Sequence, residues 1–129
     1  MSEVILDASA LLALLKEEAG AGKVADAIAM SRMTSVNYAE VVSHFVHAGM
    51  PASEVDAMLR PLPMTIVDAD QALATLAGRL RAVTAEAGLS LGDRFCLALA
   101  LRDGLPALTA DKSWRTIADA AGVTASVIR

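Results

Sequence analysis

The sequence predicts an α/β fold in which a parallel sheet is covered by helices on both faces. Short apolar or β-branched runs alternate along the chain with longer segments of helical periodicity. Strands that are separated by helices usually pair in parallel. Glycine and proline mark the ends of several helical segments, at Gly49, Pro61 and Gly88. Together these two patterns predict a three-layer α/β/α arrangement around a sheet of about five strands.

Five segments have the composition of strands. The first is a short apolar run, and the third is β-branched at every position. The second is a weak strand. The predicted strands are 3–6, 33–35, Thr65–Val67, Ala107–Thr109 and 124–127.

The segments between these strands have the periodicity and the stop signals of helices. Asp70 is placed to cap one long helix, and Ser90 to open the next, which ends near Gly104. The predicted helices are 9–16, 23–30, 37–47, 51–59, 70–87, 90–103 and 113–121.

Composition is that of one folded domain, which we expect to cover residues 1–129. Hydrophobic residues make up 55% of the chain and aromatic residues only 3%, so the core is built from small and branched aliphatic side chains. The net charge of −4 argues against a general nucleic-acid coat, which would be basic. A nuclease is not excluded, because local charge matters more than the total.

The sequence carries no sign of export or of membrane insertion. The first residues lack a positively charged leader, and no apolar run approaches the ~20 residues of a membrane span. The single cysteine, Cys96, lies in an apolar run and cannot form an internal disulfide. We expect it to fill the core of a cytoplasmic protein.

Four acidic residues are placed where an α/β fold builds a site. Asp7 and Asp111 follow predicted strands, while Glu40 and Asp93 lie just inside predicted helices. Ligands of open parallel sheets bind beyond the carboxyl ends of the strands. Two carboxylates about 4 Å apart repel by roughly 4 kcal/mol at an effective dielectric of 20. A cluster of all four would therefore imply a bound divalent cation or raised pKa values.

Each of these acids also has a purely structural interpretation. Asp7 could cap the helix that starts at Ser9, and Asp111 could cap the last helix. Glu40 follows Asn37 by three residues, as in a capping box. Asp93 follows a serine at the same spacing. The two interpretations are compatible, since a capping carboxylate is held in place by the helix that it caps.

Four short strings contain the four acids. They are ILDASAL at 5–11, TSVNYAE at 34–40, LSLGD at 89–93 and LTAD at 108–111. In their order and spacing these strings resemble those of PIN domains, and most of all those of the VapC toxins of bacterial toxin–antitoxin pairs. The resemblance covers nearly the whole chain.

The resemblance implies a sheet of strand order 3-2-1-4-5, which makes the first and fourth strands neighbours. It also implies an endoribonuclease toxin that depends on Mg²⁺ or Mn²⁺ and hydrolyses RNA phosphodiester bonds with a metal-activated water. The implied partners are an RNA substrate, a cognate VapB-type antitoxin and a second copy of the chain. The implied catalytic and metal-binding residues are Asp7, Glu40, Asp93 and Asp111.

Hydroxyl groups next to two of these acids could support the site. Ser9 and Thr109 could orient a ligating carboxylate or a water, although local hydrogen bonding explains them equally well. His44 and His47 follow Glu40 at helical spacing, but we expect ordinary surface or half-buried histidines rather than a zinc site.

Three basic residues and one tryptophan lie close to the four acids in the sequence. Arg94, Lys112 and Arg115 could meet RNA phosphates, and we expect them to form a solvated charged face. A lone tryptophan such as Trp114 is typical of a core or an interface.

Two other function classes remain open at this point. One is a PIN-fold module that binds protein or RNA without catalysis. The other is a phosphoacceptor receiver-like domain, which should carry paired acids near the first strand and a lysine after a late strand. That pattern fits poorly, because Asp7 has no acidic neighbour and Lys112 follows Asp111 directly.

Overall fold

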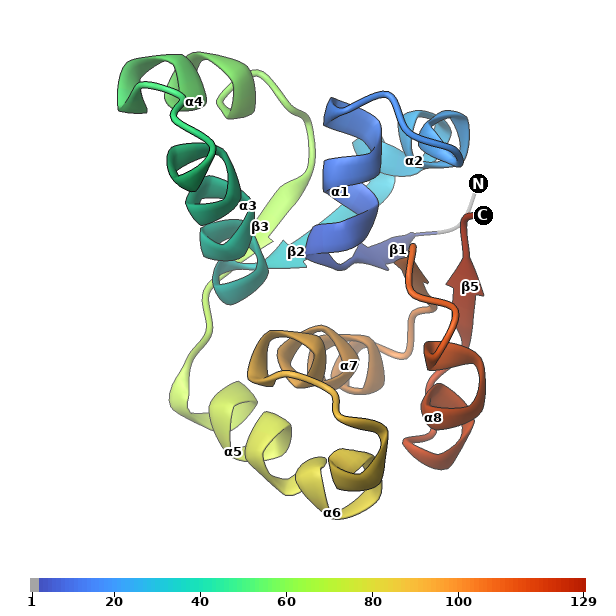
Figure 1. Ribbon diagram of the computed structural model, residues 1–129. Coiled ribbons are helices and arrows are strands. Elements are labelled where there is room, and N and C mark those ends of the chain that lie inside the picture. The colour runs from blue at the N-terminus through green and yellow to red at the C-terminus, as the bar shows by residue number, and fades with distance from the viewer. Residues whose placement is uncertain (1–2) are drawn as a thin grey trace.

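A five-stranded parallel sheet forms the centre of the computed structural model, which describes residues 3–129 (Figure 1). Every pair of neighbouring strands is parallel, and the order is β3-β2-β1-β4-β5. The predicted α/β class and the order 3-2-1-4-5 are both confirmed. The strands are β1 (Val4–Leu6), β2 (Ser31–Thr34), β3 (Thr65–Val67), β4 (Ala107–Thr109) and β5 (Ala125–Val127).

Helices cover both faces of this sheet. In Figure 1, α1 and α2 lie on one side of the strands and α7 lies on the other, with α5 and α6 beyond it. Two short 3-10 turns, η1 (Ile28–Met30) and η2 (Ala85–Ala87), complete the secondary structure. The helices are α1 (Ala8–Leu15), α2 (Ala21–Ala27), α3 (Ser35–His47), α4 (Ala52–Leu59), α5 (Gln71–Arg79), α6 (Arg81–Thr84), α7 (Leu91–Asp103) and α8 (Trp114–Ala120).

The side chains of the central strand divide the core into two clusters. Val4 and Leu6 pack into the cluster formed with α1 to α4, whereas Ile5 packs into the cluster formed with α5, α7 and α8. This follows from the period of two along a strand, which sends successive side chains to opposite faces. A strand that is apolar at every position is therefore buried on both faces, as the predicted three-layer arrangement requires.

The second strand and the third helix differ from the prediction. The strand begins at Ser31 and ends at Thr34, not over 33–35, and Ser35 already belongs to α3. The reason is the cap: the Thr34 hydroxyl accepts a hydrogen bond from the backbone N–H of Asn37 at 3.0 Å. Thr34, and not Asn37, is thus the N-cap of α3.

Two of the predicted helices are interrupted. The segment 70–87 divides into α5, α6 and η2, and the turn tightens at Leu80, whose carbonyl accepts from the N–H of Val83 at 3.1 Å and the hydroxyl of Thr84 at 2.9 Å. Such a threonine-to-backbone bond competes with regular helix bonding. The segment 23–30 likewise ends in the 3-10 turn η1. Other helix ends agree with the prediction to within one or two residues.

The expected roles of five further residues are settled by their burial. Cys96 and Trp114 are fully buried, so both are core residues as expected, and burial raises the pKa of the Cys96 thiol. Lys112 is exposed, as is Arg115. The prediction for Arg94 is wrong: the residue is only 8% exposed, in a stretch of α7 (94–100) that is buried throughout. Its guanidinium donates to the carbonyl of Ala77 on α5 at 3.5 Å.

None of the helices within residues 3–129 combines the length and the hydropathy that crossing a membrane requires.

Candidate active site

Asp7 lies at the carboxyl end of β1 and connects that strand to α1. Its Oδ1 accepts from the N–H of Ala10 at 2.8 Å, so Asp7 is the N-cap of α1. Its Oδ2 accepts from the hydroxyl of Thr109, on the neighbouring strand β4, at 2.6 Å. The Ser9 hydroxyl lies 2.8 and 2.9 Å from the two carboxylate oxygens. Asp7 is therefore a helix cap, as one interpretation of the sequence predicted. It is also fixed in place at the carboxyl edge of the sheet, by which we mean the side at which the parallel strands end.

The partners of Asp7 are all neutral. Only 3% of the residue is exposed, and among residues 3–129 no lysine or arginine forms an ion pair with it. Burial raises the pKa of Asp7 to about 6, against the lowering effect of the hydrogen bonds from Thr109, Ala10 and Ser9; the charge of Asp93 raises it further. A buried carboxylate with no cation nearby is costly to ionise, and such a pKa is typical of functional sites.

Ser9 and Thr109, which the sequence placed beside this site, join three elements around Asp7. Besides its bonds to the carboxylate, the Ser9 hydroxyl accepts from the N–H of Ala110 at 2.9 Å. The Ser9 and Thr109 hydroxyl oxygens are 3.3 Å apart. The two hydroxyls thus hold β1, α1 and the end of β4 in one network.

Glu40 reaches the same region from α3. Its Oε1 accepts from the side-chain amide of Asn37 at 2.8 Å, and the same amide donates to the backbone carbonyl of Gly92 at 2.9 Å. Desolvation raises the pKa of Glu40, the bond from Asn37 lowers it, and the charge of Asp93 raises it. Glu40 is therefore a second carboxylate with no cationic partner among the described residues.

Asp93 occupies the first turn of α7. It forms a reciprocal capping box with Ser90: the Asp93 N–H donates to the Ser90 hydroxyl at 3.1 Å, and the Ser90 N–H donates to the Asp93 carboxylate at 3.0 Å. As a negative charge it raises the pKa of both Asp7 and Glu40. Asp93, on α7, therefore lies close enough to influence both Asp7 and Glu40 through space.

Asp111 follows β4 but is engaged in a local turn. Its Oδ1 accepts from the N–H and the hydroxyl of Ser113 at 2.9 and 2.7 Å. Its own N–H donates to the Thr109 hydroxyl at 3.1 Å. The side chain is thus tied to the entrance of α8, close to the capping role that the sequence also allowed.

The four acids do not converge on one point. Within residues 3–129, no three Asp, Glu, His or Cys side chains lie close enough to hold a metal ion together. Mutual repulsion of uncompensated carboxylates and the turn at Ser113 both favour the spread arrangement. The donor set nevertheless suits a hard divalent cation, because it consists of carboxylate oxygens that have only neutral partners. The raised pKa values that clustering was expected to cause are present at Asp7 and Glu40, although burial is their largest cause.

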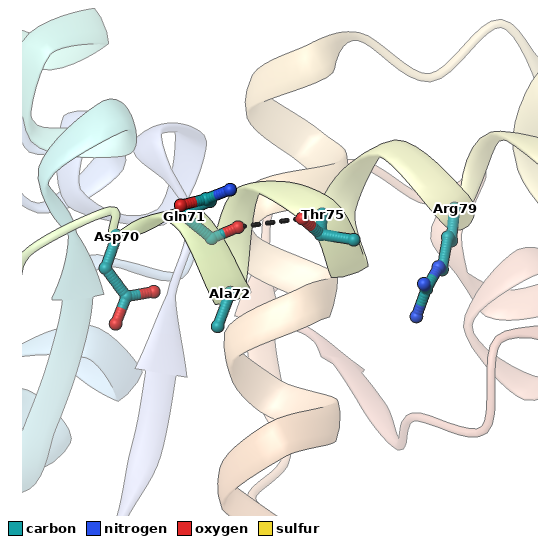
Figure 2. A pocket seen from close by; sticks show the side chains of 5 residues that line it. All are labelled: Asp70, Gln71, Ala72, Thr75 and Arg79. Atoms are coloured by element: carbon teal, nitrogen blue, oxygen red, sulfur yellow. Dashed lines mark hydrogen bonds between the residues drawn. The ribbon is translucent and has the colours of Figure 1, made fainter.

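One of these acids, Glu40, lines a hollow on the surface and is therefore accessible. A hollow of about 580 Å³ runs along α3 and is lined by Val36, Ala39, Glu40, Ser43, His44 and His47. Both histidines have the exposed or half-buried setting expected for them. Another hollow, of about 600 Å³, follows α5 from Asp70 to Arg79 (Figure 2). It contains none of the four acids, and the one hydrogen bond between its lining residues is internal to α5.

Two residues of the site were not found from the sequence. Asn37 and Gly92 lie in the strings that carry the resemblance, and Asn37 was also considered as a cap, but neither was assigned to the site. Both contact Glu40. The spacing of three between Asn37 and Glu40 places them on one helix face, and this was the available signal. Gly92 contacts Asn37 across a separation of 55 residues in the sequence, so no local pattern could predict the contact.

The fold and the site together define a parallel α/β domain with uncompensated acids at the carboxyl edge of its sheet. Residues 4–120 match the PIN domain, so the chain belongs to the PIN-domain family, a family of nucleases. No curated protein is similar enough to match the chain.

Solved structures with this fold include toxins of toxin–antitoxin pairs, over nearly the whole chain. VapBC-5 of Mycobacterium tuberculosis, a member of the VapBC family, is 26% identical with a TM-score of 0.69 and covers 98% of this chain and 99% of that chain. DNA-bound VapBC of Salmonella typhimurium is 15% identical, has a TM-score of 0.75 and covers 100% of both chains. VapC20 of M. tuberculosis, described as a sarcin-ricin loop cleaving toxin, is 17% identical, with a TM-score of 0.73 over 95% and 97%.

Proposed function

We propose that this protein is a metal-dependent endoribonuclease, the toxin of a VapBC-type toxin–antitoxin pair. The observation that carries the proposal is Asp7, a buried carboxylate with a raised pKa and only neutral partners at the carboxyl edge of a PIN fold. The description of the neighbour VapC20 as a sarcin-ricin loop cleaving toxin supports RNA as the substrate.

In this proposal the catalytic and metal-binding residues are Asp7, Glu40, Asp93 and Asp111, and the ion is Mg²⁺ or Mn²⁺. A bound divalent ion supplies an acidified water and relieves the charge of the phosphate during hydrolysis. Ser9 and Thr109 keep the Asp7 carboxylate in one orientation through their hydrogen bonds. Asp111 contributes once its carboxylate turns away from Ser113, a change confined to an exposed turn.

The proposed partners follow from the structural neighbours, several of which were solved as toxin–antitoxin complexes. We propose that a cognate VapB-type antitoxin binds and inhibits this chain in the cytoplasm, and that the chain forms a homodimer. The hollow beside Glu40 is accessible in the isolated chain, so RNA or an antitoxin segment can reach Glu40.

The experiment is RNA cleavage by purified, antitoxin-free protein. Wild type should cleave total cellular RNA with Mg²⁺ or Mn²⁺ and should not cleave it in EDTA. Asp7→Asn should lower the rate by at least about 100-fold, because it removes a ligand charge while keeping the side-chain shape. Asp119→Asn is the matched control, since it removes an exposed carboxylate on α8. Equal cleavage by wild type and Asp7→Asn would overturn the assignment.

A second candidate is a PIN-fold module that binds protein or RNA without catalysis. It is favoured by one observation: within the described chain no three potential ligands lie close enough to share an ion. This module would bind antitoxin or RNA, yet neither wild type nor any variant would cleave RNA at any concentration of Mg²⁺ or Mn²⁺. The same assay therefore separates the two candidates.

A further inference from the structure

The Glu40 carboxylate is seated on the backbone of Gly92, in the first turn of α7. A Cβ atom built at position 92 would overlap the Glu40 side chain, and its three nearest atoms are the carboxyl carbon and both carboxylate oxygens of that residue. Gly92 does not have a positive φ, so glycine is not needed there for backbone conformation. The missing side chain matters for a different reason, which is the room that it leaves for a carboxylate.

Asn37 fixes the carboxylate within this seat. The residue is 1% exposed, and both its amide protons and its side-chain oxygen form hydrogen bonds. Its amide group uses both protons, one for Glu40 Oε1 at 2.8 Å and one for the Gly92 carbonyl at 2.9 Å. Its own carbonyl oxygen accepts from the Thr34 hydroxyl at 2.6 Å. The amide therefore cannot rotate without losing several bonds, and it links α3 to α7 at the point where Glu40 lies.

One carboxylate oxygen of Glu40 is left available by this arrangement. Oε1 accepts from Asn37, whereas Oε2 accepts no hydrogen bond from residues 3–129. A neighbouring donor that holds one oxygen and leaves the other free is how proteins orient a ligating carboxylate. The seat also keeps Glu40 near Asp93, the residue that follows Gly92.

We propose that Gly92 and Asn37 are positioning residues, which aim the Glu40 carboxylate at the divalent ion by giving it space and a fixed donor. The inference rests on the proposed function, because it takes Glu40 as a metal ligand. It predicts that a single methyl group at position 92 displaces the carboxylate while the fold survives. The methyl group meets only the far end of a flexible side chain.

The test measures Mn²⁺ binding by the Gly92→Ala variant. The concentration of free Mn²⁺ is determined by electron paramagnetic resonance. Moving a ligand or its orienting partner typically weakens metal binding by about 10–100-fold, and we expect a loss in this range. Gly78→Ala is the matched control, because Gly78 is also helical but has no atom within 4 Å of the added Cβ. It should bind Mn²⁺ like wild type. Thermal unfolding in EDTA should show Gly92→Ala no less stable than wild type.

A double-mutant cycle separates positioning from general damage. Glu40→Ala should weaken Mn²⁺ binding, and adding Gly92→Ala to it should have no further effect, because the displaced group is already absent. Asn37→Ala, which removes the donor but leaves the space, should weaken binding in the same direction and also depend on Glu40.

The outcomes divide the inference from the proposed function. Suppose that wild type binds Mn²⁺ and that Glu40→Ala binds it more weakly. If Gly92→Ala or Asn37→Ala then binds Mn²⁺ as tightly as wild type, the positioning role of that residue is overturned, and the proposed function is not. If Gly92→Ala lowered the Mn²⁺ affinity by the same factor in wild type and in Glu40→Ala, Gly92 would not act through Glu40. If wild type binds no Mn²⁺, both the proposed function and this inference fail.

Discussion

Carboxylates at the two ends of the parallel strands, the amino edge and the carboxyl edge of the sheet, lie in opposite electrostatic surroundings. At the amino edge, Arg32 donates to Asp103 at 2.9 Å and to Glu3 at 2.6 Å, and Arg102 donates to Asp103 at 2.9 Å. Burial alone would raise the pKa of Asp103, but the bonds from Arg102 and Arg32 bring it below its ordinary value. At the carboxyl edge, Asp7 has only neutral donors and a pKa raised to about 6.

This difference shows that the acids at the carboxyl edge are not left unpaired for lack of basic residues. The chain has 11 lysines and arginines, and two arginines serve one half-buried aspartate at the amino edge. Ion pairs stabilise one edge, and charge is left uncompensated at the other. A fold that leaves a buried carboxylate without a cation gives up stability there, which is typical of a functional site.

The largest expected effect is a gain of stability from Asp7→Asn in the metal-free protein. The pKa of Asp7 rises from 3.8 to about 6 on folding, so its contribution to stability is complete below about pH 3.8 and is lost as the pH rises through about 6. That rise corresponds to about 3 kcal/mol of unfolding free energy. Asparagine stays neutral, so the variant should be more stable than wild type by a margin that grows from about pH 4 to about pH 7.5. Urea unfolding in EDTA measures this difference.

The control for this prediction is Asp119→Asn, whose carboxylate is exposed. Its stability difference from wild type should not change over the same pH range. If Asp7→Asn behaved like this control, the carboxyl edge would not be electrostatically strained, and the contrast between the edges would be lost.

A smaller effect is expected from Thr109→Val, which keeps the side-chain shape and removes the 2.6 Å hydrogen bond to Asp7. Hydrogen bonds to charged groups contribute about 1.5–3 kcal/mol, so we expect a loss of about 2 kcal/mol at neutral pH. The pKa of Asp7 should rise further, because a donor that lowers it is gone. Urea unfolding of Thr109→Val and Thr109→Ser measures the difference, and serine should restore most of it. A serine variant as unstable as the valine variant would contradict this account.

The smallest effect is expected at the amino edge, from Arg32→Ala. Its side chain is 34% exposed, so solvent screens the ion pairs and the loss should be about 1 kcal/mol at neutral pH. The lowered pKa of Asp103 means that its contribution is present above the ordinary value and is lost as the pH falls through the lowered one. Unfolding at neutral and acidic pH should show the deficit shrinking with acid. A deficit that grew with acid would reverse the assigned sign.

Much of the fold could be predicted from the sequence, because the strands are bounded by helices and by glycine or proline. Position at a strand end also identified Asp7 and Asp111 as residues of the carboxyl edge. The strand order could not be derived in this way: strands as short as Val4–Leu6 carry no information on their neighbours, and the order came from the resemblance to PIN domains.

The remaining features depend on tertiary contacts. The break at Leu80 was not predicted, although Gly78 lies two residues before it, because it depends on the Thr84 hydroxyl four residues later. Arg94 was expected to be solvated, but α7 packs between the sheet and α5, and its residues 94–100 are all buried. The contact of Asn37 with Gly92 joins distant segments, so no local pattern pointed to the seat of Glu40.

The claim that the carboxyl edge is a cation site is tested most directly by thermal unfolding with and without Mn²⁺. Three proteins are compared: wild type, Asp7→Asn at the carboxyl edge and Asp103→Asn at the amino edge. Binding to the folded state at about 100 times the dissociation constant adds about 2.7 kcal/mol of stability. We predict that Mn²⁺ raises the unfolding temperature of wild type and of Asp103→Asn by similar amounts, and that of Asp7→Asn little or not at all. An equal rise in all three proteins, or none in wild type, would contradict the account.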